Sequence, residues 1–275
     1  MNDNIKQFLD DAFKPYGNFP ARKDVEQELL ANLTEKYNDL KAEGKSDDEA
    51  YRLTTESFGD VSEIMKHVDH DERADDKQNL GQTIVDGIKN VFGPSDNRFR
   101  ATSLIDADLA GTDLSGSDFS MSALIQANFE KSDLRESTFK AAALKGANFR
   151  NTNLSKATFN GSDLQEADFS GANLTNAKLA HSSLKGTNFS GATLDNTEFK
   201  RSDLGNLSFD GLHLSGTVFD GSSLNQTSFN GATLERVSFH YSDVKKANFE
   251  GAIMDKVTYA LLKGIKANLD NVTVQ

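Results

Sequence analysis

The sequence predicts a protein built in two ways, with a small helical region followed by a long β-helix whose chain winds in four-sided coils. An apolar residue recurs at every fifth position from Leu104 to Val274 with almost no exception and no insertion. Every phenylalanine after residue 100 lies at one of these positions, so composition alone does not produce the pattern. The prolines, in contrast, all precede the repeat. We therefore expect α-helices in residues 1–70, a charged linker and an amphipathic capping helix in 71–100, and a solenoid in 101–275.

The composition restricts the classes of function. The chain of 275 residues has no cysteine, which excludes disulfides and thiolate metal sites. The N-terminus has no basic segment leading into an apolar run, and no apolar run is long enough to span a membrane. We therefore expect a cytoplasmic protein. The net charge of -12 disfavours a simple nucleic-acid binder.

Helices are predicted in the first seventy residues from the spacing of their apolar side chains. The first helix ends at Pro15-Tyr16-Gly17, and a longer one runs from Ala21 to Ala42. Gly44 closes the longer helix, because glycine readily adopts the left-handed conformation found at helix C-termini. The apolar stripes are Ile5, Phe8, Leu9 and Phe13 in the first helix, and Val25, Leu29, Leu33, Tyr37 and Leu40 in the second.

A third helix is predicted from a capping signal. Ser46 supplies a side-chain oxygen for an unpaired amide, and Glu49 follows three residues later. The apolar face of this helix contains Ala50, Leu53, Thr54 and Phe58. A short fourth helix is expected from Val61 to His67.

The run from Arg22 to Ile64 resembles the small helical signalling domain of the HAAS type, close to the permease-prefix domain of bacterial regulators. The resemblance implies a regulatory role beside a transcriptional repressor of the PadR type, and it brings no catalytic residue. The residues that carry it are Val25, Glu28, Leu29, Gly44, Ser46, Glu49, Ala50, Phe58, Gly59 and Asp60.

Residues 68–77 form a charged linker, and an amphipathic helix follows, ending at Gly93-Pro94. A helix on a membrane surface is usually rich in lysine and arginine, whereas this one carries only Lys77 and Lys89. A stack of coils needs its open end covered, so we expect this helix to cover the first coil. Its apolar face contains Leu80, Ile84, Ile88, Val91 and Phe92.

A period of five fits neither a helix, which repeats every 3.6 residues, nor a strand, which repeats every two. It fits a coil in which each unit of five residues forms one short side and turns a corner, with its central residue pointing inward. Neighbouring coils would then pair like parallel strands, about 4.8 Å apart. Leucine and phenylalanine alternate along the chain, so four sides stack leucine on leucine, while three sides would alternate them. We favour four sides, because uniform stacks repeat the same rotamers.

A second inward position lies two residues before each centre. From Thr102 to Ser202 every residue there is alanine, serine or threonine, as expected where the backbone turns close to the axis and a hydroxyl can satisfy turn amides. Aspartate or asparagine often follows, as in Ala107-Asp108-Leu109 and Ala127-Asn128-Phe129, and we expect these residues to tolerate tight turns and face solvent. Glycine recurs at the turn position two after the centre.

This is the pattern A(D/N)LXX, and residues 101–275 resemble the pentapeptide-repeat family. The resemblance implies a right-handed quadrilateral β-helix, here of about nine coils.

The pattern becomes coarser at the C-terminal end. Bulky residues occupy the small inward position at Leu207, Leu212, Val237, Val257, Leu262 and Val272. A wider or frayed cross-section would explain them. An uncovered solenoid end also exposes strand edges, which proteins usually cover or pair. A second hypothesis is therefore a homodimer through Met254, Tyr259, Leu261 and Leu262.

The sequence offers no chemistry for an enzyme. His67 and His70 lie between acidic residues, but two imidazoles make a poor metal site, and a solvated helix end explains them better. The glycines of the repeat lie at turn positions and form no phosphate-binding loop. We therefore expect no catalytic residue, no metal and no cofactor.

Two functions remain. The first is a regulatory or scaffolding protein that binds a protein partner through the rod, the helical region or both. The second comes from the family, some members of which imitate duplex DNA, bind type II topoisomerases such as gyrase and confer quinolone resistance. An acidic face would favour the second, and its candidates are Asp108, Asp113, Asp118, Asp163 and Asp168. Interspersed lysines weaken that hypothesis, because DNA presents dense negative charge.

Overall fold

The computed structural model describes residues 2–14, 22–56 and 99–275. The predicted helix from Val61 to His67, the charged linker and the amphipathic helix of residues 80–92 lie outside these residues. Within them, no helix is both long and apolar enough to cross a membrane.

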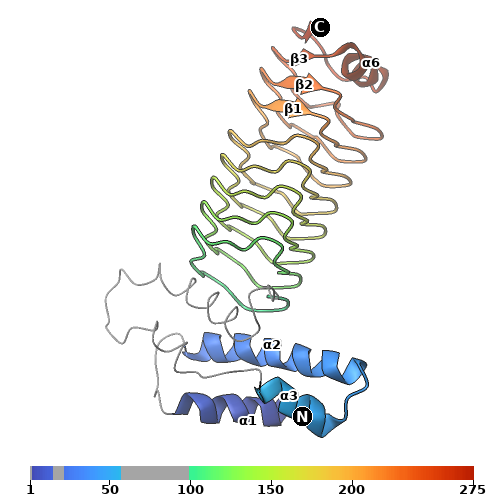
Figure 1. The fold of residues 1–275 in the computed structure, drawn as a ribbon. Coiled ribbons are helices and arrows are strands. Elements are labelled where there is room, and N and C mark those ends of the chain that lie inside the picture. The colour runs from blue at the N-terminus through green and yellow to red at the C-terminus, as the bar shows by residue number, and fades with distance from the viewer. Residues whose placement is uncertain (1, 15–21, 57–98) are drawn as a thin grey trace, which may run out of the picture.

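Three helices form the N-terminal region: α1 (Asn2–Phe13), α2 (Arg22–Ala42) and α3 (Asp47–Glu56), which contact one another (Figure 1). Their positions confirm the predicted helices. The buried side chains follow the predicted stripes, with Leu40, Phe8 and Leu53 only half-buried. The buried set is Ile5, Leu9, Phe13, Leu29, Leu33, Tyr37, Ala50 and Thr54.

The link between α2 and α3 has the geometry that its sequence predicts. Gly44 has a φ of 90°, and the amides of Lys45 and Gly44 donate to the carbonyls of Leu40 and Lys41. This is the pattern of a Schellman motif, which satisfies the last carbonyls of a helix. The hydroxyl of Ser46 then accepts the amide of Glu49 at 3.2 Å, as an N-cap does.

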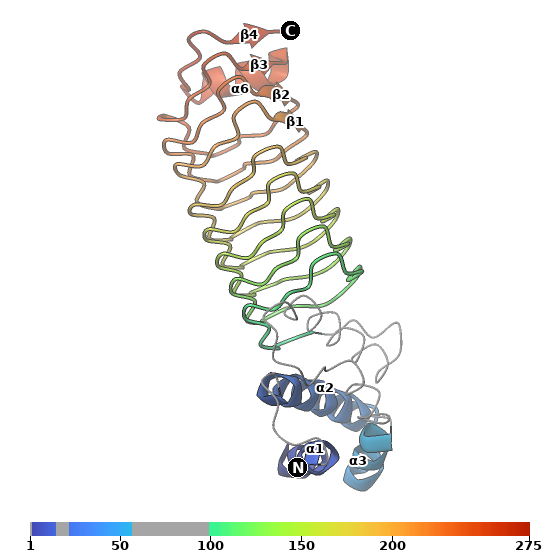
Figure 2. The ribbon, with the colours of Figure 1, turned by 90° about the vertical axis from the view of Figure 1, so that its left-hand side faces the viewer.

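Residues 99–275 wind into a rod of stacked coils (Figures 1 and 2). Parallel bridges join residues twenty apart, such as Ser103 with Ala123 and Asp108 with Asn128. Twenty residues are four units of five, so the coil has four sides, as predicted. Each unit pairs with the unit above and below it, which satisfies the backbone without long strands.

The core of the rod is a set of side-chain columns. Rings on the same side stack nearly parallel, as Phe129 on Phe149 and Phe149 on Phe169, with centroids 5.0 Å and 4.8 Å apart. Rings on opposite sides meet edge to face, as Phe149 and Phe159 do at 5.7 Å. Both arrangements are favourable for aromatic rings. Leucine stacks on leucine and phenylalanine on phenylalanine in these columns. This uniform stacking is the reason for which four sides were predicted, and it is confirmed.

The small inward residues lie where the sequence predicts, but their hydroxyls mostly bond differently. Ser132 donates to the carbonyl of Leu109 at 2.6 Å, and Thr152 donates to that of Phe129 at 2.8 Å. The expected acceptance of turn amides also occurs, since Ser202 accepts the amide of Ser182 at 3.3 Å and Ser222 accepts that of Ser202 at 3.1 Å, but donation to a carbonyl is more frequent. The donor is the hydroxyl and the acceptor is a central carbonyl of the coil before, so these residues tie adjacent coils together.

Each corner of the coil is a turn whose third residue is left-handed. Every fifth residue from Ala101 to Tyr241 has a positive φ, whether or not it is glycine. The amide of the following residue donates back across the corner, as Ser117 does to Leu114 at 3.1 Å. A positive φ at this place is the property of a type II turn. At Gly171, a Cβ would lie 2.5 Å from the Oδ1 of Asn151, so this corner specifically needs glycine.

The rod begins earlier than predicted. Phe99 is 1 % exposed, its ring stacks on Phe119 at 4.6 Å, and its amide bonds to the carbonyl of Asp118. The predicted boundary between residues 100 and 101 therefore leaves Phe99, a central residue of the first coil, outside the solenoid. Phe99 lies five before Leu104, so the same spacing rule includes it.

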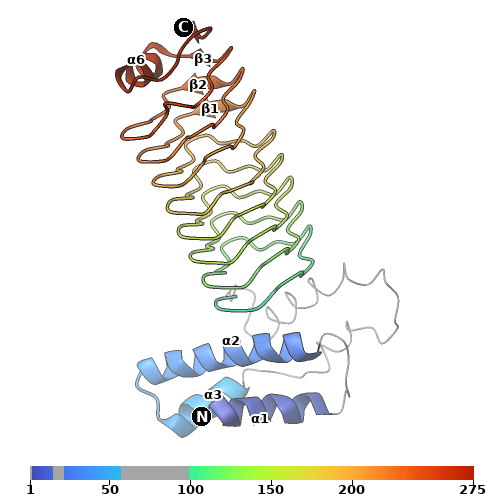
Figure 3. The same ribbon diagram turned by 180° about the vertical axis from the view of Figure 1, so that it is seen from behind.

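The C-terminal end departs from the five-residue repeat. Helix α6 (Lys256–Gly264) replaces two sides of the last coil, and its Leu262 is buried, while Val257 is 74 % exposed and not inward as predicted. The helix points Thr258 and Leu262 inward, since residues four apart share a face. Figure 3 shows α6 beside the last coils.

The strands β1 (His213–Ser215), β2 (Thr233–Glu235), β3 (Ile253–Met254) and β4 (Thr273–Val274) form one parallel sheet in that order.

Candidate interaction surfaces

The four sides of the rod give four outer faces, named here by their first central residue. Face A begins at Leu104, face B at Leu109, face C at Leu114 and face D at Phe119, and each recurs every twenty residues. In a four-sided coil, face B is opposite face D. The outward residues of a face are the one before each centre and the two after it.

The five aspartates predicted as an acidic face do not share one. The bridges place Asp108 and Asp168 on face B, Asp113 on face C, Asp118 on face D and Asp163 on face A. The reason is the corner between successive units, which turns neighbouring units to different sides. Only residues a multiple of twenty apart lie on one line, so this prediction was wrong as a single surface.

Face B instead carries the largest excess of acidic residues. Its lower end has two cations, and both lie near a carboxylate: Lys131 is 3.1 Å from Glu130, and Arg150 is 3.5 Å from Asp168. Among the described outward residues of this face after Asn151, lysine and arginine are absent. The carboxylates of face B are Asp108, Glu130, Asp168, Asp210, Glu250 and Asp270.

Face B is also flat. The corner residue of this face is glycine in five successive coils, and the residue before each centre is short and polar. Some of these side chains bond up the rod, as Asn128 does to Asp108 at 2.8 Å and Asn148 does to Asn128 at 2.8 Å. A partner surface can therefore approach the backbone closely. The glycines are Gly171, Gly191, Gly211, Gly231 and Gly251.

The opposite face has a different charge. Face D carries Lys140, Lys178, Lys200 and Arg201, against Asp118, Glu198 and Asp220. Face C is acidic in composition, but ion pairs neutralise part of it, with Arg135 2.6 Å from Asp133 and Lys156 2.7 Å from Glu136. The Lys156 ammonium also lowers the pKa of Glu136. The rod is thus electrically two-sided, which its overall charge does not reveal.

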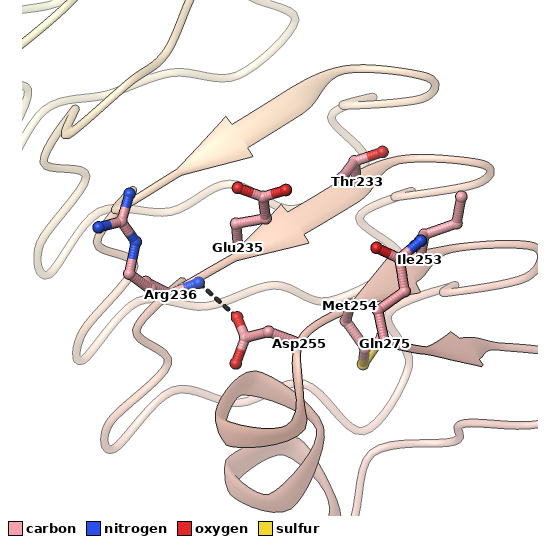
Figure 4. A pocket seen from close by; sticks show the side chains of 7 residues that line it. All are labelled: Thr233, Glu235, Arg236, Ile253, Met254, Asp255 and Gln275. Carbon is pink, nitrogen blue, oxygen red and sulfur yellow. Dashed lines mark hydrogen bonds between the residues drawn. The ribbon is translucent and has the colours of Figure 1, made fainter.

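The C-terminal end has a shallow hollow of about 250 Å³ between β2, β3 and the chain end (Figure 4). Its main polar group is Asp255, the N-cap of α6. One carboxylate oxygen accepts the amides of Val257 and Thr258 at 2.7 Å and 3.0 Å, and the other accepts the Thr258 hydroxyl and the Arg236 amide. Burial acts to raise the pKa of Asp255, but these four bonds together lower it. The hollow is lined by Thr233, Glu235, Arg236, Ile253, Met254, Asp255 and Gln275.

The four residues predicted for a dimer contact lie around this end. Met254 and Leu262 are 1 % and 0 % exposed, so they belong to the core of the chain itself and are not a surface. Tyr259 and Leu261 are partly buried against the same core. The apolar side chains exposed here are Val257 and Val274.

No arrangement for metal or acid–base chemistry is found in the described residues. They contain no cluster of three or more metal-binding side chains. His67 and His70 lie outside them. His213 lies 4.0 Å from Glu235 on an exposed part of face C, at the limit of an ion pair.

The sequence interpretation missed face B and the role of Asp255. Face B was detectable by comparing residues twenty apart instead of neighbouring units. The sequence interpretation did not consider Asp255, although an aspartate that begins a short apolar and basic run is an N-cap signal.

Comparison with known proteins identifies the repeat. A family model described as a pentapeptide repeat region matches residues 112–189. A second, described as pentapeptide repeats in eight copies, matches residues 172–211 and 213–251. No curated protein matches the chain significantly.

Three solved structures are similar to this chain. HetL, a pentapeptide repeat protein involved in heterocyst differentiation regulation from the cyanobacterium Nostoc, is 22% identical, with 69% of this chain and 90% of HetL covered and a TM-score of 0.32. QnrB1, a plasmid-mediated fluoroquinolone resistance protein, is 25% identical, with coverage of 57% and 82% and a TM-score of 0.37. Another pentapeptide repeat protein from Nostoc is 26% identical, with coverage of 40% and 93% and a TM-score of 0.34.

Proposed function

Because this chain belongs to the pentapeptide-repeat family, whose members fold as right-handed quadrilateral β-helices, we propose that it is a non-enzymatic interaction protein. Its rod would present a flat face to a macromolecular partner, in a regulatory or scaffolding role. A solenoid without insertions offers extended surfaces and no deep pocket, which suits a large ligand better than a small one.

The observation that carries this proposal is face B. Over its upper part it combines Asp210, Glu250 and Asp270 with glycine corners and without a lysine or arginine among its described outward residues. Complementary charge speeds association and selects partners. We therefore expect a protein partner with a flat basic surface.

The test is affinity capture from a native cell extract, with the full-length chain and with Asp210→Lys/Glu250→Lys/Asp270→Lys. The triple variant should lose the captured partner, and rising salt should weaken capture by the unchanged chain. The same partner retained by the triple variant would contradict a role for face B.

Asp220→Lys is the matched control. Asp210 accepts the Ser228 hydroxyl at 2.5 Å and the Asn230 amide at 2.8 Å. On face D, Asp220 accepts the Ser238 hydroxyl at 2.5 Å and the His240 amide at 2.9 Å. Asp210→Lys and Asp220→Lys, made as single variants, therefore lose equivalent hydrogen bonds and reverse one charge each, so only the face differs between them. Asp210→Lys should weaken capture of the partner, and Asp220→Lys should leave it unchanged.

Imitation of DNA is the alternative function, and charge density disfavours it. Duplex DNA carries one negative charge for about every 1.7 Å of its axis. On face B, Asp210, Glu250 and Asp270 are spread over three coil spacings of about 4.8 Å each. We expect micromolar protein to leave the supercoiling activity of gyrase and its poisoning by quinolones unchanged. A clear effect on either would restore this alternative, with gyrase as the partner.

The helical region and the C-terminal end complete the proposal. We assign a regulatory role to α1–α3, because Arg22–Ile64 resembles HAAS-type domains. The partner that this resemblance implies is a transcriptional regulator. We also keep the homodimer, now through the outer edge of β4 and the exposed Val257 in place of the buried Met254 and Leu262. An unpaired strand edge is a site at which a second chain can add.

A further inference from the structure

The bridges between coils are interrupted at one level of the rod. Along each face, residues twenty apart pair continuously through the regular coils. Within residues 99–254, two pairs are missing from this series: Asn188 with Ser208 on face B, and Thr193 with His213 on face C. Pairing resumes directly above, since Ser208 bridges Ser228 and His213 pairs with Thr233. Both gaps lie between the same two coils. At the C-terminal end, Asn248 and Asn268 on face B also form no bridge.

Hydrogen bonds show the same interruption on three faces. At this level of the described rod, five successive amides have no bond of normal geometry to the coil above: Leu184, Gly186, Phe189, Gly191 and Leu194. Higher in the rod such a bond is also missing, but at scattered positions and near the C-terminal end, as for the amides of Gln226, Phe239, Tyr241 and Phe249. One coil below, the equivalent amides donate at 2.8–2.9 Å, as Leu164 does to Ser183 and Phe169 does to Asn188.

Face D stays closed at this level. The amides of Leu179 and Phe199, on either side of the gap along the chain, donate to Glu198 and Val218 at 2.7 Å each. We call the interval between residues 184–194 and 203–213 the seam. Faces B and C lack their bridges and the hydrogen bonds of Phe189, Gly191 and Leu194 at the seam, whereas face A keeps the Ser183–Asp203 bridge and lacks the hydrogen bonds of Leu184 and Gly186. Face D is bonded throughout.

The packing is looser at the seam as well. The stacked rings Phe189 and Phe209, which lie on either side of the seam, have centroids 5.6 Å apart. The other stacked pairs in the described rod are closer, from 4.6 Å for Phe99 and Phe119 to 5.4 Å for Phe169 and Phe189. A hollow of about 330 Å³ lies on face A at this level. It is lined by Ser183, Leu184, Lys185, Asp203, Gly205, Asn206, Ser223 and Asn225.

We attribute the interruption to two successive bulky inward residues; a single one, Val237, leaves the Val218–Ser238 bridge intact. Leu207 and Leu212 occupy the small inward position immediately before Ser208 and His213, and every described coil below has alanine, serine or threonine there. The absence of a hydroxyl group on Leu207 and Leu212 does not explain the missing bridges. Ala147 and Ala167 have no hydroxyl group at the same inward position, and the bridges next to them are intact. Two leucines in succession overfill a space made for small side chains, and overpacked cores shift the backbone.

We infer that the seam is a built-in bending point that divides the rod into a lower block, residues 99–200, and an upper block, residues 203–275. Face D acts as the hinge side, because its bonds persist, and faces A, B and C open and close. Bending changes the curvature of face B, and so lets the rod adapt to a partner surface. This property goes beyond the proposed partner binding and does not depend on it.

Hydrogen exchange of the unmodified full-length chain, resolved to single amides, gives the first test. The amides of Leu184, Gly186, Phe189, Gly191 and Leu194 should exchange at least about tenfold faster than the equivalent amides twenty residues earlier, because they lack the inter-coil bond. Equal protection at the two levels would overturn the inference.

The second test replaces the two bulky inward leucines so that the two coils can approach each other. In Leu207→Thr/Leu212→Thr, small residues return to the inward position, and each hydroxyl can donate to a carbonyl below, as Thr187 does to Leu164 at 2.9 Å. Protection of the five amides should rise toward the level of the coil below. If the folded double variant leaves their exchange unchanged, leucine size does not cause the seam.

Distances between spin labels test bending itself, and the absence of native cysteine makes labelling specific. Arg150→Cys/Asn230→Cys spans the seam on exposed positions of face B. Ala110→Cys/Ser190→Cys has the same separation of eighty residues within the lower block. The pair across the seam should give the broader distance distribution, and Leu207→Thr/Leu212→Thr should narrow it. Equal widths for the two pairs in the unmodified rod would reject a bending point.

Discussion

At the scale of the residue, the rod depends on central side chains that each contact the same kind of residue above, below and across. Phe149 stacks on Phe129 and Phe169 and meets Phe139 and Phe159 edge to face. If the Phe149 ring is removed, no single neighbouring side chain can move to fill the cavity, because each neighbour is packed within its own column.

Phe149→Ala should therefore lower the free energy of unfolding by about 3–5 kcal/mol, the usual cost of emptying a buried phenylalanine site. Urea unfolding followed by circular dichroism measures it. Phe149→Leu is the control and should cost markedly less, because Leu179 already occupies a phenylalanine column with no exposed area. If both variants lost the same free energy of unfolding, the side-chain volume at position 149 would not determine stability.

The carboxylate of Asp255 predicts a pH dependence. Its pKa is lowered in the folded chain, so its contribution is present above the unfolded value of about 3.9 and is lost as pH falls through the folded value. An asparagine at this position would still cap α6 through one oxygen, but its amide group replaces the oxygen that accepts the Arg236 amide and the Thr258 hydroxyl. Asp255→Asn should therefore cost about 1 kcal/mol at pH 7, the usual net contribution of a hydrogen bond. The difference in urea midpoint between the two proteins should shrink as pH falls from about 5 to 3. A difference that stays constant over this range argues against the ionised cap.

At the scale of the element, α6 explains how the rod ends. The unit centred on Tyr259 does not form a coil side but lies within α6. A helix satisfies its own backbone and covers the core with Leu262. The N-cap Asp255 and the buried Thr258 join it to Arg236 and Val237 of the coil below.

Leu262→Ala should destabilise this end by about 2–5 kcal/mol, because it empties a fully buried site. Hydrogen exchange should show faster opening of α6 and β3 and little change below the seam, since coils contact only their neighbours. Val257→Ala is the control on the same helix, and with a side chain 74 % exposed it should change stability by less than about 0.5 kcal/mol. Fast exchange along the whole rod after Leu262→Ala would contradict a local role.

At the scale of the whole molecule, the rod has an open strand edge at β4 and a two-sided charge. We expect light scattering at micromolar concentration to give the mass of a dimer. Val257→Lys, at the proposed contact, should give a monomer, and Ile105→Lys, an exposed apolar position at the other end of the rod, should leave the dimer intact. A strictly monomeric mass for the unmodified chain would end the dimer hypothesis.

The architecture was predictable from the sequence because it repeats a local rule. Each unit of five needs one large apolar centre, one small inward residue and one left-handed corner, so a column such as Leu104 to Val244 predicts the coil and its number of sides. The helices α1–α3 were predictable for a similar reason, since their apolar spacing and the caps at Gly44 and Ser46 are local signals.

Three features were decided only by the tertiary structure. Asp108 and Asp113 are neighbours in the repeat but lie on different faces, because charge on a face depends on residues twenty apart. Residues 256–264 continue the five-residue count up to Tyr259, yet they form α6, whose Thr258 and Leu262 pack against the coil below. The sequence marks Leu207 and Leu212 as bulky inward residues, but only the stacking of one coil on the next places the interrupted bridges directly below them. In each case the deciding contact joins residues distant in sequence, and a local pattern carries no record of it.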